Sequence, residues 1–209
     1  MKIKRSTPFT ILTALLLCAV APLLWAAKAG DPAPEFTATA SNGKTVHLAD
    51  YRGKYVVLEW HNNGCPYVGK HYNSGNMQRL QKQWTSQGVA WLTILSSAPG
   101  KQGYVTANEE NDYLAKMQAA PTAALLDPTG EIGHLYEAKT SPQMVVINPQ
   151  GVIIYSGAID DKPTTDLQDV PNATNYVSQA LQQSMAGKPV QTAATRPYGC
   201  SVKYADATY

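Results

Sequence analysis

Cys65 is the residue of this sequence whose surroundings point most directly to chemistry. It follows an apolar run of β-forming residues, KYVVLEW (residues 54–60), after a short polar loop, and Pro66 comes directly after it. Proline is favoured in the first turn of a helix. A sulfur between a buried strand and a helix start faces unpaired backbone N–H groups and the positive end of the helix dipole, which lower the pKa of a thiol. The pattern therefore predicts that Cys65 is a nucleophile.

An inert, buried cysteine is the alternative interpretation of Cys65, because free cysteines are among the most buried residues. The polar residues 62–64, Asn-Asn-Gly, argue against burial in an apolar core. Cys200 is the only other cysteine outside the N-terminal apolar run that holds Cys18. Two cysteines can form one bridge, and their number alone leaves a structural bridge and redox chemistry both open.

Three histidines, His61, His71 and His134, invite a copper-site interpretation together with Cys65. The ligand set is incomplete because the loop holds one cysteine, so we expect no metal and no cofactor. We expect His61 to tune the thiolate or cap the loop, and His71 to lie on or beside a helix surface. Arg196, near the C-terminal cysteine, is a candidate to stabilise a thiolate or sulfenate, although a solvated arginine is the commoner case.

The N-terminus has the outline of a secretory signal. Three basic residues within the first five precede an almost wholly apolar run over residues 9–25, and Ala27 and Ala29 occupy the small-residue positions of a cleavage site. We expect a signal peptide of residues 1–29 and an exported, periplasmic protein without a stable membrane anchor. A retained anchor is the alternative, but the apolar run is at the short end of a spanning helix.

The mature chain is close to electrical neutrality. Removing residues 1–29 leaves 13 basic and 15 acidic residues, a net charge of −2, whereas the whole chain carries +2. The chain has no cluster of lysine and arginine residues that would bind the phosphates of a nucleic acid. Its length of 180 residues suits one domain with a sizeable core, so we treat residues 30–209 as a single domain.

Strand and helix patterns alternate along this domain. We expect strands at 54–60, 89–97, 123–126, 144–148 and 152–156, and helices at 67–87, 109–118, 132–136 and 175–185. Residues 73–75, Asn-Ser-Gly, weaken the middle of the first helix. Early alternation followed by a hairpin and a helix predicts an α/β fold with a mixed central sheet and helices on both faces. The tail after Pro189 is too short to fold alone, so Cys200 packs back on the domain or stays mobile.

Six segments together resemble the redoxin branch of the thioredoxin superfamily, which includes the alkyl hydroperoxide reductase and thiol-specific antioxidant proteins. They are GDPAPEF from residue 30, LADYRGKYVVLEW from 48, NGCPYVGKHY from 63, SSAPGKQGYV from 96, TSPQMVVINPQGVIIYSGAIDD from 140 and GKPVQTAATRPYGCSVKY from 187. The segments span residues 30–204, nearly the whole mature chain, and the set is specific although each piece alone is weak.

The resemblance implies a thioredoxin-like fold, with Pro142 as a cis-proline facing Cys65. It also implies that Cys200 is a resolving cysteine, because similar redoxins pair a tail cysteine with the active-strand cysteine. The implied substrates are a hydroperoxide or a protein disulfide, and the implied partner is an external dithiol reductant such as a thioredoxin-like protein.

The sequence departs from the family patterns beside Cys65. Thioredoxins carry C-x-x-C, and here Asn62 occupies the first cysteine position. Peroxiredoxins carry P-x-x-x-T-x-x-C, and here Leu58 and Asn62 replace the proline and the threonine. The hydroxyl that usually holds the peroxide is absent, and Asn62 or His61 is the candidate to supply a hydrogen bond in its place.

Three functions remain as hypotheses. In the first, Cys65 reduces hydroperoxides and Cys200 resolves the product. In the second, the same two sulfurs exchange with a disulfide of another protein. In the third, a permanent bridge between Cys65 and Cys200 only stabilises a binding or scaffold module, by ~4–5 kcal/mol in the chain-entropy model for so long a loop.

Overall fold

The computed structural model describes residues 27–206. Cys18 and nearly all of the predicted signal segment, residues 1–29, therefore lie outside the described residues. Between residues 27 and 206 no helix is long and apolar enough to cross a membrane.

The described chain follows the predicted order of strands and helices closely. The strands are β1 (Thr37–Ala40), β2 (Thr45–His47), β3 (Val56–Trp60), β4 (Ala90–Leu95), β5 (Ala123–Leu126), β6 (Thr140–Ser141), β7 (Gln143–Ile147), β8 (Ile153–Gly157) and β9 (Cys200–Ser201). The α-helices are α1 (Pro66–Asn73), α2 (Asn76–Thr85), α3 (Ala107–Met117), α4 (Glu131–Leu135) and α5 (Tyr176–Met185), and 3-10 helices cover Leu48–Tyr51 and Leu167–Asn172.

Seven strands form one mixed sheet in the order β2-β1-β5-β4-β3-β7-β8. Strand β3 lies inside the sheet, parallel to β4 and antiparallel to β7. The β7–β8 hairpin is also present, as the sequence predicts. The loop that carries Cys65 therefore begins at a strand that is hydrogen-bonded on both sides, to β4 and to β7, which holds the start of the loop in a fixed position.

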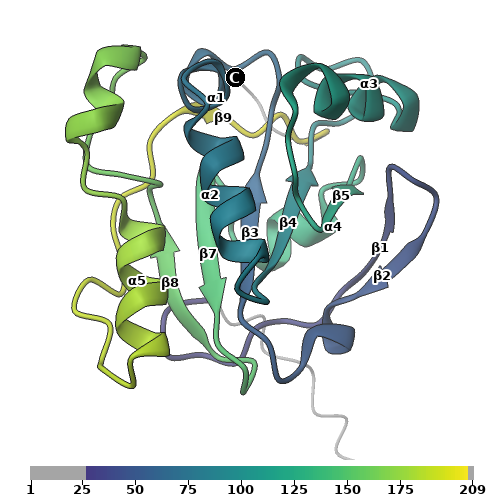
Figure 1. Cartoon of the computed structure of the whole chain (residues 1–209). Helices are drawn as coiled ribbons and strands as arrows, with labels where there is room; N and C mark the ends of the chain where they lie inside the picture. Colours follow the sequence, from purple (N-terminus) through teal and green to yellow (C-terminus); the bar gives the residue numbers. More distant parts are fainter. Residues whose placement is uncertain (1–26, 207–209) are drawn as a thin grey trace, which may run out of the picture.

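Two apolar cores cover the two faces of this sheet. Leu58 and Trp60 of β3 belong to one core, together with Ile132 of α4. Val57 points to the opposite face, where side chains of α1, α2 and α5 complete the second core. Figure 1 shows α1, α2 and α5 in front of the strands and α4 behind them. The predicted arrangement of helices on both faces is confirmed.

The predicted helix over residues 67–87 is two helices rather than one. Helix α1 ends at Asn73 and α2 begins at Asn76, with Gly75 between them at a φ of +72°. This left-handed conformation is open to glycine at little cost and breaks the helical run. Residues 73–75, which the sequence predicts to weaken the helix, divide it into two separate helices.

The C-terminal tail packs back onto the domain. Residues 193–204, which we call the strap, first run parallel to β8 through a bridge between Ser156 and Ala194. Strand β9 then pairs antiparallel with β6, with Cys200 opposite Ser141. Figure 1 shows this yellow segment passing along the upper edge of the sheet beside the start of α1. The two-stranded β6–β9 sheet was not predicted from the sequence.

Candidate functional site

Cys65 caps the N-terminal end of α1. It has an extended backbone conformation, and Pro66 occupies the first turn of the helix as the sequence predicts. The Cys65 carbonyl accepts the Gly69 N–H at 2.8 Å, while the Cys65 N–H donates to the Asn62 carbonyl at 3.0 Å. Free N–H groups at such a helix start favour a negative charge on the adjoining side chain.

Cys65 and Cys200 form a disulfide, with their Cα atoms 6.0 Å apart. The expectation that polar neighbours keep Cys65 out of an apolar core is wrong, because Cys65 is 1% exposed and belongs to the second core, whereas Cys200 is only partly buried. The Ser141 carbonyl oxygen lies 3.1 Å from Cys65 Sγ. The Ser141–Pro142 peptide is cis, as the resemblance predicts. The structure therefore brings together both predicted cysteines and the turn that carries Pro142.

Asn62 holds the loop before Cys65 in shape. Its Oδ1 accepts the Gly64 N–H at 2.9 Å, and its Nδ2 donates to Oε1 of Gln102 at 2.9 Å. Gly103 has a φ of +85°, and a Cβ there would lie 2.2 Å from Asn62 Nδ2, so only glycine fits. Asn62 thus connects the Cys65 loop to the segment after β4. Its amide is already engaged on both sides in this disulfide form.

His61 is buried among acidic and aromatic side chains. Its Nδ1 lies 3.5 Å from Glu59 Oε1, and its ring contacts those of Tyr72 and Tyr113 with centroids 4.9 and 5.1 Å away. Among the described residues no partner hydrogen-bonds to either ring nitrogen. The predicted role of His61 at the thiolate remains a proposal.

Glu59 is a fully buried carboxylate beneath the same loop. It accepts hydrogen bonds from Tyr72 Oη at 2.8 Å, Trp91 Nε1 at 2.7 Å and Gln81 Nε2 at 3.2 Å. Burial alone would raise the pKa of Glu59, but the nearby His61 imidazole and the hydrogen bonds from Trp91 and Tyr72 lower it below its ordinary value. The sheet therefore carries a negative charge at its centre.

Arg196 is exposed on the wall of a groove beside the disulfide. The groove has a volume of about 670 Å³. Its lining residues are Tyr67, Thr140, Ala158, Asp160, Asp161, Pro163, Tyr176, Thr195, Arg196, Pro197, Tyr198 and Gly199. The groove is thus lined by Tyr67, close to Cys65 in the chain, and by Gly199, next to Cys200. Arg196 is placed to contact a molecule bound in the groove.

Asp160, in the segment after β8, has a buried side chain. It accepts a hydrogen bond from Tyr198 Oη, and its Oδ2 lies 3.9 Å from Nε2 of His71. His71 is itself fully buried rather than on the helix surface, and Asn76 Nδ2 lies 2.9 Å from its Nδ1. His71 Nε2 also lies 3.4 Å from Tyr198 Oη, and this contact joins α1 to the strap near Cys200.

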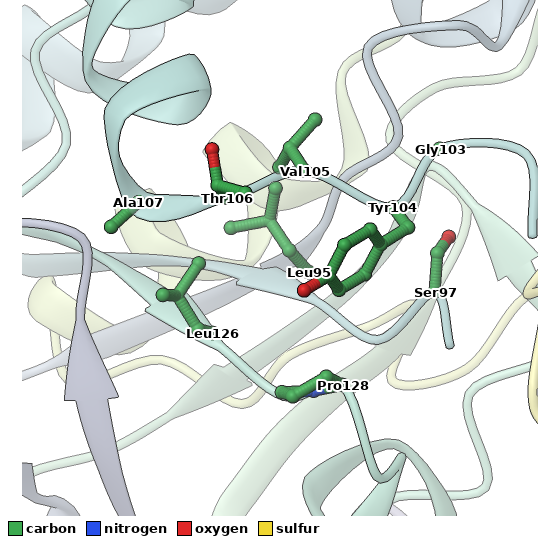
Figure 2. Close-up of a pocket in the computed structure, with 9 residues that line it drawn as sticks. All are labelled: Leu95, Ser97, Gly103, Tyr104, Val105, Thr106, Ala107, Leu126 and Pro128. Atoms are coloured by element: carbon green, nitrogen blue, oxygen red, sulfur yellow. The ribbon is translucent and has the colours of Figure 1, made fainter. Parts of the chain in front are cut away.

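A second, smaller cleft of about 200 Å³ is lined by the segment between β4 and α3 and by the end of β5 (Figure 2). Leu95, Leu126 and Pro128 contribute apolar walls, and the half-exposed Tyr104 lies across it. No lining residue of this cleft is a neighbour of either cysteine. Over residues 27–206 there is also no cluster of three or more histidine, cysteine or acidic residues arranged to hold a metal ion.

Several residues around the site escaped sequence reasoning. Glu59 was part of a strand pattern, and its partners Tyr72, Gln81 and Trp91 come from three later elements. Tyr198 had only its closeness to Cys200 as a signal. No sequence signal identifies the Ser141 carbonyl, because every residue has a backbone carbonyl group.

Known proteins resemble this chain along most of its length. The relatives include the thiol-disulfide oxidoreductase ResA of Bacillus subtilis, 26% identical over 60% of this chain, a match that spans 64% of ResA. Another is "Probable glutathione peroxidase 8-B" of Xenopus laevis, 24% identical over 66% of this chain and 71% of its own. A solved structure of an uncharacterized conserved protein from Geobacillus kaustophilus superposes with a TM-score of 0.71 at 22% identity, covering 86% of this chain and 94% of that one.

The strand order, the cysteine at the start of α1 and the cis peptide facing it agree with the thioredoxin-like fold. The model of the AhpC/TSA family matches residues 29–156, which is more than half of the chain. The protein is therefore a member of the AhpC/TSA family.

Proposed function

We propose that this protein reduces hydroperoxides, with Cys65 as the attacking sulfur and Cys200 as the resolving one. The Cys65 thiolate forms a bond to one peroxide oxygen, the O–O bond breaks, and the other oxygen leaves as an alcohol or water after taking a proton. Cys65 is then a sulfenic acid. The Cys200 thiol attacks it, the disulfide forms and water leaves. An external dithiol is oxidised in turn and restores both thiols.

The observation that carries this proposal is the unequal setting of the two bonded sulfurs. Cys65 caps α1, where backbone donors and the helix dipole favour a thiolate, whereas Cys200 lies in the two-residue strand β9. Their pairing in one disulfide supports a resolving role for Cys200. The match to a named glutathione peroxidase is consistent with a peroxide substrate.

Exchange with protein disulfides is the second candidate. The match to ResA, a named thiol-disulfide oxidoreductase, favours it, as does Asn62 at the position of the usual peroxiredoxin threonine. The same two sulfurs act, and the electrophile is a disulfide of another protein instead of a peroxide. A peroxide-consumption assay with a generic dithiol reductant separates the two candidates.

Sulfenic-acid trapping tests the roles of the two cysteines. We expect Cys200→Ser to accumulate trapped label on Cys65 after exposure to hydroperoxide, and Cys65→Ser to carry no label and lose turnover. Label on Cys200 in the Cys65→Ser protein would reverse the roles. If neither variant is labelled and the bridge resists mild reductant, the disulfide is structural and the protein is a scaffold or binding module.

We also propose that the protein acts after export, in the periplasm, where the segment before Gly30 has been removed. The sequence pattern of residues 1–29 supports this proposal. The intact mass of protein recovered from the periplasmic fraction tests it. A mass that includes residues 1–25 would contradict cleavage.

A further inference from the structure

The strap is held on the N-terminal side of Cys200 by contacts that involve no sulfur. The Ser156 N–H donates to the Ala193 carbonyl at 3.1 Å, and the Thr195 N–H donates back to the Ser156 carbonyl at 3.2 Å. Thr195 Oγ1 also accepts the Ala158 N–H at 2.9 Å. These bonds would remain if the disulfide were cleaved.

The strap is held equally well on the other side of Cys200. The Val202 N–H donates to the Lys139 carbonyl at 3.0 Å, and the Lys203 carbonyl accepts the Ala98 N–H at 2.8 Å. The Val202 side chain is 5% exposed and belongs to one of the two apolar cores. Releasing the strap would therefore expose a core residue to water, which is unfavourable.

Glycines shape the surface on which the strap lies. A Cβ on Gly157 would lie 2.2 Å from Thr195 Oγ1, and one on Gly133 of α4 would lie 2.3 Å from Tyr204 Oη. That Tyr204 hydroxyl donates to the Ala138 carbonyl at 2.7 Å. The strap therefore packs so closely against these two glycines that a larger side chain would not fit. The domain surface is complementary to the strap on both sides of the disulfide.

We propose that the strap stays docked in the dithiol form and makes Cys65 selective for small hydroperoxides over disulfides of folded proteins. This inference rests on the proposed function and adds its substrate size. Cys65 is 1% exposed in the disulfide form, and a strap that stays docked after reduction would keep a folded partner from bringing its own sulfur in line with Cys65. A hydroperoxide of a few atoms can enter through the groove, whose lining includes Tyr67, two positions after Cys65, and Gly199, one position before Cys200.

Docking also keeps the resolving thiol in place. With β9 still paired to β6, the Cys200 thiol remains opposite Ser141, the residue whose carbonyl contacts Cys65 Sγ. Condensation with the sulfenic acid is then a local step. The Cys200 thiol is already close to the Cys65 sulfenic acid, so the reaction does not have to wait for a free tail to find it.

The Cys200→Ser variant tests docking without the disulfide. Its amide hydrogen exchange reports on the strap directly, because the N–H groups of Val202 and Thr195 are bonded only while the strap is docked. We expect both to exchange at least about a hundredfold more slowly than in an unstructured peptide. Exchange at unstructured rates would overturn the proposal.

Reactivity of Cys65 in the same background gives the second readout. We expect N-ethylmaleimide and hydrogen peroxide to react readily, and a maleimide carrying a long polyethylene glycol chain to react about tenfold more slowly than on an exposed thiol. Gly133→Ala should remove that difference by pushing Tyr204 off α4. Gly69→Ala is the matched control, since a Cβ there meets only Asn73 Nδ2 at 3.6 Å.

The outcomes separate this inference from the proposed function. Consumption of peroxide by a protein whose strap amides are unprotected would keep the peroxidase function and reject strap docking. A protected strap without peroxide turnover would keep the docked strap and reject the peroxidase function. Equal rates for the small and the large maleimide in Cys200→Ser would reject the size selection.

Discussion

Two buried glutamates near the active loop have the same side chain and the same burial but opposite surroundings. Glu59 on β3 and Glu110 on α3 are both 0% exposed. Glu59 accepts hydrogen bonds from several donors, whereas neither carboxylate oxygen of Glu110 has a hydrogen-bond partner among the described residues. Burial and Glu59 raise the pKa of Glu110 to about 7, although His61 opposes them. Hydrogen bonding, rather than burial, therefore decides which acid stays charged.

The largest expected effect comes from Glu59→Ala. The change leaves the Tyr72 hydroxyl and the Trp91 and Gln81 N–H groups without their acceptor and opens a cavity. We expect a loss of about 3–5 kcal/mol in the free energy of unfolding, measured by urea denaturation. Asp112→Asn, on the exposed side of α3, is the control and should change it by less than about 0.5 kcal/mol. A loss below about 1 kcal/mol for Glu59→Ala would contradict the role assigned to its hydrogen bonds.

Glu110→Gln tests the other half of the comparison through pH. The folded pKa of about 7 lies above the ordinary 4.5, so the folded protein binds this proton more tightly than the unfolded chain does. Its contribution to the free energy of unfolding is complete below pH 4.5 and is lost as the pH rises through about 7. The full loss is at most about 3 kcal/mol. Between pH 5 and 8 we expect the variant to lose less stability than the wild type. Parallel curves would show that Glu110 does not titrate in this range.

The smallest effect is expected from Glu109→Gln, one residue away on the same helix. Glu109 is exposed and completes a capping box with Thr106, whose N–H and hydroxyl lower the pKa of the carboxyl. Its contribution is present above pH 4.5 and is lost as the pH falls, the opposite sign to Glu110. We expect Tm at neutral pH to fall by no more than about 2 °C, because glutamine also fits a capping box. A fall of more than about 5 °C would contradict the small effect assigned to this cap.

The glutamates also show what a sequence can and cannot predict here. The run KYVVLEW predicts β3 because apolar β-formers are continuous, but the partners of Glu59 come from α1, α2 and β4. Glu109 and Glu110 are neighbours of one type, and only tertiary packing makes one exposed and the other buried. The position of Cys65 at the start of a helix was predictable from the local pattern alone, whereas its role as a nucleophile stays a prediction. Its pairing with Cys200 came from the family resemblance, since β9 is two residues long and has no pattern of its own.

The bond between Cys65 and Cys200 also sets a mechanical property of the molecule. The bridge closes a ring with a sequence separation of 135 residues, which contains every element from α1 to β9 and leaves β1, β2 and β3 outside. When the oxidised chain is pulled by its two ends, tension passes through the sulfur bond, and roughly 450–490 Å of extended chain stays out of the load path. Reduction adds that length to the extension. The redox state therefore acts as a length limiter on a stretched molecule.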